Sequence, residues 1–320
     1  MRARSNPSFF FLVAAVGLFI LELAWGTSVI PFGDVVAALT GGIPSESGTA
    51  RIVLDVRLPR AVSALLCGAA LSVSGILMQT LFRNPLAGPD VLGVTSGASL
   101  GVALWILGAK TFAGFGISSF QHLGLGGAAV LGALVSTGIV LAASRHVDDG
   151  TGLLVFGVMF GFAVSAFVSV LLNWALPDQV QRYVAWGFGS FASSGWERVR
   201  WLGAVMLVAL AASILLMKPC NAFLLGETYA ASLGVNVRFV RFAVICVASV
   251  LAGLTTALSG PVAFIGVAAP HMCRMIAAST DHRTILPLGI VAGGVVALLA
   301  DLGTRLGGVT VIPLNVVTSL

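Results

Sequence analysis

The sequence predicts an all-α membrane protein, a polytopic bundle of about ten transmembrane helices. Of its 320 residues, 58% are hydrophobic and only 9% are charged, and the mean hydropathy is +1.04. A soluble domain carries roughly 25% charged residues, because its surface must face water. The apolar runs are long and unbroken. They therefore favour helices over the short alternating segments of a β-barrel.

Ten apolar segments follow one another along the chain without a linker or a low-complexity tract. The first follows a basic N-terminus, as in a signal peptide. It is too long for one, contains Glu22 and leads into further spans, so we expect it to be retained. The expected spans are Phe9–Ile30, Ala61–Phe82, Val91–Gly108, Leu123–Ala143, Leu153–Ala175, Val199–Met217, Val240–Leu258, Ile265–Ala278, Ile285–Leu302 and a tenth that begins near Ile312.

The tenth expected span is short. Pro313 to Leu320 would extend only about 12 Å as a helix, against a hydrocarbon core of roughly 30 Å. We therefore expect residues 1–320 to form a single transmembrane domain with an incomplete tenth helix.

The basic residues, 15 arginines and 2 lysines, are scattered singly in loops, so we expect no nucleic-acid partner. The basic N-terminus suggests that this end is cytoplasmic. The residues then expected inside are Arg83, Arg145, His146, Lys218, Arg238, Arg241, Arg274 and Arg283. Those expected outside are Arg51, Arg57, Arg60, Lys110, Arg182, Arg198, Arg200 and Arg305. This nearly even split suggests that some outer arginines meet an acidic partner outside. A different topology, or contact with lipid phosphates, would also account for it.

No pattern of catalytic residues is present: the sequence has no HExxH, no GxSxG and no paired carboxylates on one helix face. The four cysteines form no CxxC pair, so we expect neither a disulfide framework nor a metal site. Lys110 and Lys218 are the only lysines, and neither lies in a GxxxxGK[ST] sequence. The chain therefore cannot bind ATP through a P-loop of its own, and any ATP-driven process would need a partner.

Glycines recur at GxxxG spacing inside three spans. Small residues one turn apart let helices approach closely in lipid. This spacing predicts a tightly packed bundle rather than a functional site. The pairs are Gly97 with Gly101, Gly157 with Gly161, and Gly289 with Gly293.

Several motifs follow one another in a specific order. They are RLPR at 57–60, GAALSVSG at 68–75, RNPLAGP at 83–89, LGETYAASLGV at 225–235, FIGVAAPH at 264–271, DHR at 281–283 and AD-x-x-x-R at 300–305. Together they resemble the FecCD-type permeases, the transmembrane subunits of ABC importers for ferric siderophores, haem and cobalamin. The resemblance covers most of the chain. Near the end the family usually reads Glu-Leu-Pro-x-Gly, whereas this chain has Ile312-Pro-Leu-Asn315.

The resemblance implies a BtuC-like (type II) importer fold in the bacterial inner membrane. It implies a non-catalytic transport subunit that works with a second permease subunit, identical or not, two ATPase subunits and a periplasmic substrate-binding protein. ATP and Mg²⁺ would bind to the ATPase, and this chain would hold no cofactor. The substrate class stays open among siderophore, haem and cobalamin.

The resemblance also implies three groups of site residues. An ATPase-coupling loop between spans six and seven would contain Glu227, Thr228, Tyr229, Ala230, Leu233 and Gly234. Its helix formers and final glycine suit a short helix with a left-handed cap, although a helix resting on lipid headgroups is an alternative. Docking of the binding protein would use Arg57, Arg60 and Arg305. The translocation pathway would lie at the subunit interface, along Gly157, Met159, Gly161 and Ser165, which ordinary core or lipid-facing positions would explain equally.

A secondary transporter driven by an ion gradient is the alternative function. Such a transporter normally needs ionisable groups at membrane depth to bind its coupling ion. The expected spans contain few, chiefly Glu22 and Asp301, and both lie near span ends. The sequence therefore favours the ATP-driven importer.

Overall fold

The computed structural model describes residues 7–26, 28–44, 48–114, 124–147, 150–306 and 312–320, and no strand occurs among them. Within these residues, six helices are long and apolar enough to cross a membrane. The expected all-α membrane fold is therefore confirmed. The helices that match the ten expected spans are α1 (Pro7–Ala24), α4 (Leu58–Leu81), α5 (Val94–Gly114), α7 (Gly124–Ala143), α8 (Gly150–Asn173), α10 (Trp196–Leu215), α13 (Val237–Ser259), α14 (Ile265–Ala277), α15 (His282–Gly303) and α16 (Leu314–Ser319).

The first helix ends earlier than expected, at Ala24 instead of Ile30. Gly26 lies two residues beyond Ala24, and glycine is unfavourable in a helix interior, whereas Pro31 disfavours helical backbone only at Ile30. The chain therefore leaves the helix and starts a separate short one, α2 (Phe32–Thr40), whose first turn follows Pro31.

Short helices connect the spans, and apart from α12 only loops were expected at these places. They are too short, or too polar, to give a membrane-span signal in the sequence. One of them, α3 (Thr49–Arg51), continues through the π-helical turns of Ile52–Arg57 into α4, so that one helix runs from Thr49 to Leu81. The others are Pro89–Leu92, α9 (Pro177–Gly187), Phe191–Ser193, α11 (Met217–Phe223) and α12 (Glu227–Ser232).

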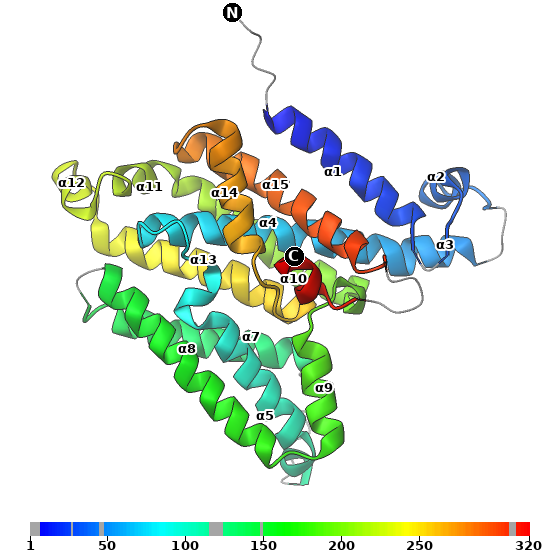
Figure 1. Cartoon of the computed structure of the whole chain (residues 1–320), viewed down its shortest axis with the longest axis horizontal. Helices are drawn as coiled ribbons and strands as arrows, with labels where there is room; N and C mark the ends of the chain where they lie inside the picture. Colours follow the sequence, from blue (N-terminus) through cyan, green and yellow to red (C-terminus); the bar gives the residue numbers. More distant parts are fainter. Residues whose placement is uncertain (1–6, 27, 45–47, 115–123, 148–149, 307–311) are drawn as a thin grey trace, which may run out of the picture.

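Helix α4 lies at the centre of the bundle, against α1, α10, α13, α14 and α15 (Figure 1). Almost all of its side chains from Cys67 to Leu81 are buried. Helices α4 and α15 cross with their backbones in contact, because a Cβ atom on Gly68 would lie only 2.2 Å from the Gly293 carbonyl oxygen. The close packing expected from the glycine spacing is confirmed here.

A second group of helices, α5, α7, α8 and α9, lies beside this central part (Figure 1). Helices α5 and α7 meet at Gly97, Gly101 and Gly132, where a Cβ on Gly132 would lie 2.1 Å from the Gly97 carbonyl oxygen. Helix α8 is much less covered, since only 17% of its most apolar window is buried within the chain. This leaves one long apolar helix open to lipid or to another subunit.

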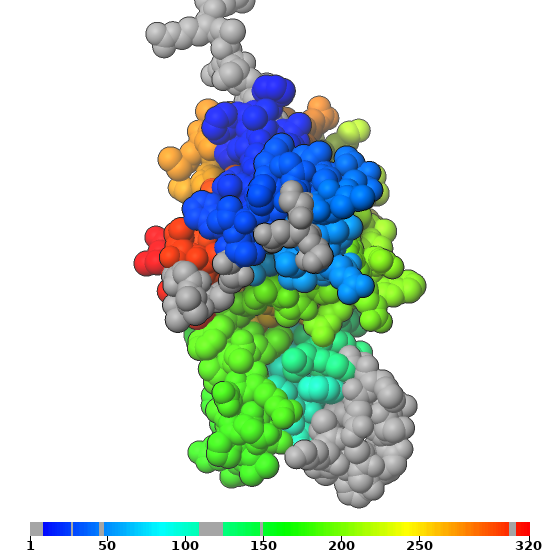
Figure 2. Space-filling model, turned by 90° about the vertical axis from the view of Figure 1, so that its right-hand side faces the viewer, coloured from blue at the N-terminus to red at the C-terminus, as the bar shows by residue number. Residues whose placement is uncertain are grey.

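The spans give the molecule two distinct ends. One end, here called the α12 end, gathers α11, α12, the start of α13 and the start of α15 (Figure 1). The opposite end, here called the α2 end, gathers α2, α3, the last turn of α1 and the last turn of α15. In a view onto the α2 end, the residues of α1 to α3 cover its upper part in blue, and the α9 region lies below in green (Figure 2).

Candidate functional site

Helix α12 is an exposed single helix at one end of the bundle, and glycines with positive φ flank it. Gly226 precedes it with φ 107°, and Gly234 follows it with φ 82°. The Gly234 N–H donates to Ala231 O (2.9 Å) and the Val235 N–H donates to Ala230 O (3.1 Å). This is the Schellman arrangement, in which a left-handed glycine closes a helix. The expected helix with a left-handed glycine cap is therefore confirmed.

The apolar side chains of this segment point in two directions. Ala230 is completely buried against the bundle. Tyr229 is 49% exposed, and Leu233 is 59% exposed. A rigid short helix that displays an aromatic and an aliphatic side chain is typical of a docking element, because such side chains carry much of the binding energy at protein interfaces.

Arg241 of α13 holds α12 in place, and its role was missed in the sequence. Its Nη2 donates to Glu227 Oε2 (2.8 Å), and its Nη1 donates to Val147 O (2.8 Å). The arginine is buried, so it ties the start of α12 to the segment that follows α7. The sequence does contain a signal, since a charged residue one turn into an apolar helix usually needs a partner.

A second polar cluster fixes α11 against α15 at the same end. Asp281 caps α15 by accepting from the Arg283 N–H (2.9 Å), and the Asn221 Nδ2 donates to Asp281 Oδ1 (2.7 Å). These two hydrogen bonds lower the pKa of Asp281 from its ordinary value. Asn221 also bonds the ring of His282 (2.7 Å), which is buried. The DHR motif thus anchors the segment that leads to α12.

At the α2 end, the three arginines expected to dock the binding protein have partners inside the chain. Arg57 is buried and donates from Nη1 to Leu23 O and Ala24 O, both at 2.8 Å. These carbonyls end α1, where a helix lacks internal donors. Arg57 therefore closes the C-terminus of α1.

Arg60 and Arg305 form a buried ionic cluster with two carboxylates. Arg60 makes a two-pronged contact with Asp301, through Nε (2.7 Å) and Nη2 (2.8 Å). Arg305 donates from Nη2 to Asp301 (3.0 Å) and to Glu22. The side chains of Glu22 and Asp301 are at most 1% exposed, that of Arg305 is 7% exposed and that of Arg60 is 15% exposed. The cluster therefore joins α1, α4 and α15.

The acidic groups that contact Arg60 and Arg305 thus lie within the protein. The i, i+4 spacing of Asp301 and Arg305 was the available signal in the sequence. Glu22 gave none, because it lies 279 positions away from Asp301 in the chain. At the same end, Arg51, Arg198 and Arg200 are exposed.

The four residues expected along the translocation pathway lie on α8, two on its exposed face and two on the face that packs against the rest of the chain. Met159 is 66% exposed and Ser165 is also exposed, so both lie on the open face of the helix. Gly157 is buried, and a Cβ there would lie 2.4 Å from Val91 O. Gly161 lies beside Gly93. The two glycines thus position α8 against the segment before α5 and do not face its open side.

The structure is that of a polytopic helical membrane protein, and the comparisons with known proteins identify it as the permease subunit of an ABC importer in the inner membrane. The model of the FecCD transport family matches residues 12–320, so the chain belongs to this family.

Relatives of known function and structure agree with this assignment. The vitamin B12 import system permease protein BtuC of Salmonella paratyphi A is 35% identical over 269 residues, which cover 83% of this chain and 79% of that protein. BtuC of Escherichia coli O6:H1 is 35% identical over 268 residues, with the same coverage. A solved metal-chelate type ABC transporter in an inward-facing conformation is 28% identical, with a TM-score of 0.83 over 98% of this chain and 94% of that chain.

Proposed function

We propose that this chain forms the membrane passage for a large metal chelate of the cobalamin, ferric-siderophore or haem class, and that ATP hydrolysis in a separate subunit drives transport. The observation that carries the proposal is α12, with Tyr229 and Leu233 exposed and Glu227 held by Arg241. ATP and Mg²⁺ would bind to that subunit, since the sequence has no P-loop. The BtuC relatives favour cobalamin as the substrate.

The same proposal assigns partners to the exposed surfaces. A second permease subunit would cover the open face of α8, where Met159, Phe162 and Phe167 are all more than half exposed. The pathway would then run along this face, past Met159 and Ser165. Two ATPase subunits would bind at the α12 end, through α12 with Thr228 and its neighbours.

For the periplasmic binding protein we propose the α2 end as the docking surface. Arg60 is the most accessible of the three expected arginines, while Arg57 and Arg305 are held by internal groups and would support the surface from beneath. Arg51, Arg198 and Arg200 are exposed there and add positive charge. Such charge would speed the capture of an acidic partner. We also infer that residues 1–320 form one membrane domain, because the ionic cluster joins its first and last long helices.

The ion-gradient alternative receives no support from the buried carboxylates. Glu22 and Asp301 are the ionisable groups that such a transporter would use, and both are bound by arginines. A carboxylate bound in this way is a poor site for a coupling cation, because the cation would have to displace a guanidinium group.

Changing Tyr229 to aspartate is expected to uncouple the chain from its ATPase. The new carboxylate would stand where an exposed aromatic side chain now lies, and loss of such a side chain costs about 2 kcal/mol or more, roughly a thirtyfold weaker contact. The measurements are co-purification of the ATPase and ATP-dependent uptake in proteoliposomes. Tyr229→Phe is the matched control and should keep both. Undiminished ATPase binding by Tyr229→Asp would refute the role of α12.

Deleting the gene for this chain is expected to abolish uptake of labelled cobalamin and to leave uptake of ferric siderophores and haem intact. The cobalamin preference comes from the BtuC relatives. The measurement compares accumulation of the three labelled ligands in the deletion strain and in the strain complemented with the intact gene. Loss of siderophore or haem uptake instead would reassign the substrate while leaving the importer function standing.

A further inference from the structure

The short turn Pro89–Leu92, which joins α4 to α5, lies within the membrane-spanning part of the bundle and not at its end. A Cβ atom on Gly157 would lie 2.4 Å from the Val91 carbonyl oxygen. Gly157 is seven residues into α8, so this contact lies about 10 Å along the helix from its start. On its other side the turn packs against α14, where a Cβ on Gly266 would lie 2.5 Å from Pro89.

Asp90 is exposed in this turn, whereas Pro89 and Leu92 on either side of it are buried. Its carboxylate accepts a hydrogen bond from the Thr95 hydroxyl in the first turn of α5. Within the described part of the chain, no basic side chain forms an ion pair with Asp90. A carboxylate at membrane depth is costly in lipid and usually faces a water-filled cavity or an ion or substrate pathway.

The helices on either side of the turn bring no counter-charge to Asp90. Helix α8 contains no charged residue. On α14, Arg274 donates to the Gln79 side-chain oxygen of α4, and His271 is exposed without an ion pair to Asp90. Arg83, which follows α4, extends to the residue before α12.

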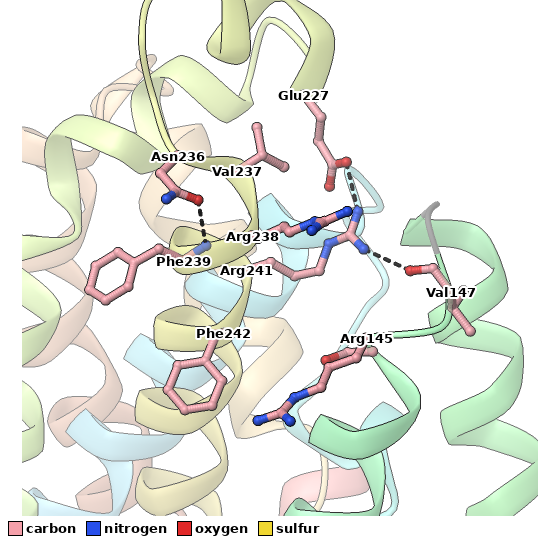
Figure 3. A pocket seen from close by; sticks show the side chains of 10 residues that line it. Arg145, Val147, Glu227, Asn236, Val237, Arg238, Phe239, Arg241 and Phe242 are labelled. Carbon is pink, nitrogen blue, oxygen red and sulfur yellow. Dashed lines mark hydrogen bonds and ion pairs between the residues drawn. The ribbon is translucent and has the colours of Figure 1, made fainter.

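The basic residues of α13 and α5 lie far along those helices. Arg238 and Arg241 are in the first five residues of α13, and Arg241 is held by the first residue of α12 (Figure 3). Helix α13 meets the start of α5 at Gly253, twelve residues beyond Arg241, or about 18 Å. Lys110 lies sixteen residues beyond the start of α5, or about 24 Å. Among the described residues, the charge of Asp90 is therefore not compensated nearby.

A row of hydroxyl groups leads from Asp90 to the open face of α8. Thr95 and Ser96 follow on the first turn of α5, and both are partly exposed. The Ser165 Oγ of α8 lies 3.4 Å from the Ser96 Oγ, and Ser165 is exposed. Ser165 belongs to the face along which the translocation pathway is proposed to run. The polar row therefore connects Asp90 with that face.

We propose that Asp90 faces the translocation pathway and selects the cargo by charge, so that neutral and cationic metal chelates pass in preference to anionic ones. The inference rests on the proposed importer function and adds a substrate class to it. A fixed carboxylate repels an anionic cargo and attracts a cationic one. At a separation of about 10 Å and an effective dielectric constant of about 20, one unit charge on the cargo changes its affinity on the order of tenfold.

The test measures ATP-dependent uptake by the full transporter in proteoliposomes, with its binding protein present. Two charge series serve as cargo. One is cyanocobalamin, which is neutral, with its anionic monocarboxylic acid and a cationic amine derivative of that acid. The other is ferrioxamine B, which is cationic, with its neutral N-acetyl and anionic N-succinyl derivatives. The binding protein is the same for every variant, so its own preference cancels when variants are compared.

Asp90→Asn keeps the shape of the side chain and an acceptor for Thr95 but removes the charge. We expect it to raise uptake of the anionic cargo relative to the neutral one by about tenfold, and to lower that of the cationic cargo by a similar factor. Asp90→Glu retains the charge and should keep the original ratios. Asp178→Asn removes a carboxylate beyond the far end of α8, where it is paired with Arg182, and should also leave them unchanged.

The location of Asp90 is tested separately, without transport. A water-soluble cationic thiol reagent should modify Asp90→Cys in the assembled transporter. The unmodified chain gives the background, and three of its four cysteines, Cys67, Cys220 and Cys273, are buried. Absence of labelling above this background would place Asp90 away from water and overturn the proposal.

The uptake ratios decide the role of the charge. Each ratio compares two cargoes in one variant, so a smaller amount of folded transporter does not alter it. Unchanged ratios in Asp90→Asn would overturn the charge selection and leave the importer function intact. An equal loss of all cargoes would also overturn it, since Asp90 would then have a structural role. If the unmodified transporter took up no cargo of either series, the proposed function itself would fail, and the charge selection with it.

Discussion

Replacing Asp301 with alanine is expected to destabilise the folded chain by about 3–5 kcal/mol, since removing one partner of a buried ion pair leaves its counter-charges uncompensated. Asp301 is 1% exposed and accepts from both Arg60 and Arg305. With the aspartate gone, Glu22 would be the only carboxylate of the cluster facing two guanidinium groups. The measurement is the free energy of unfolding in detergent, or the shift in melting temperature.

The chain offers a matched control in Asp178. Its ion pair with Arg182 also has i, i+4 spacing, but the two side chains are 54% and 71% exposed and 3.7 Å apart. Such a surface pair contributes at most about 1 kcal/mol. Asp178→Ala should therefore melt close to the unmodified chain. Equal melting of Asp301→Ala and Asp178→Ala would show that the buried cluster does not stabilise the fold.

A double variant separates loss of charge balance from loss of contacts. Replacing Asp301 and Arg60 together with leucine removes one charge of each sign and fills the space with apolar atoms. Replacing buried ion pairs by apolar residues of similar volume is often neutral or stabilising. We expect the double variant to recover most of the stability lost in Asp301→Ala.

Replacing Gly293 with alanine is expected to destabilise the chain by about 3 kcal/mol, the upper end of the cost of overpacking a core. A Cβ atom there would lie 2.2 Å from Gly68 O and 2.5 Å from the Ser72 Cβ. The obstacle is the backbone of α4, which cannot move aside as a side chain can. The helices must separate, and α4 is the helix on which most others pack. Thermal melting in detergent measures the effect.

Gly138 on α7 provides the opposite control. A Cβ atom at Gly138 meets nothing within 4 Å. In a helix interior, alanine is about 0.5–1 kcal/mol more favourable than glycine. Gly138→Ala should therefore be neutral or slightly stabilising. If Gly293→Ala behaved in the same way, the close crossing of α4 and α15 would be disproved.

Most of the fold could be predicted from the sequence, because each membrane span is recognised from the hydropathy of residues that follow one another in the chain. All ten expected spans start within three residues of the start of a described helix, from α1 to α16. The short helices α2, α9 and α11 were missed, since their formation depends on packing at the bundle ends and not on hydropathy. The end of α1 was missed because the single glycine Gly26 leaves the hydropathy pattern almost unchanged.

Among the candidate sites, too, some features could be predicted from the sequence and others could not. The exposed helix with its glycine cap could be predicted, because Gly234 acts locally on residues 230–235. The environment of Arg57, Arg60 and Arg305 could not, because Glu22, Leu23 and Asp301 are brought to them by two helices, α1 and α15, that are far apart in the chain.

The sequence by itself determined that this chain is a membrane protein, where its spans lie and which family it resembles. It also determined that the chain has no P-loop. All of these follow from composition and from short motifs, which involve only residues close together in the chain. Only the tertiary structure decided which charges are buried and paired, which glycines bring backbones together and which face of α8 stays open. Those properties depend on distances between residues remote in the chain, and such distances exist only after the helices have packed.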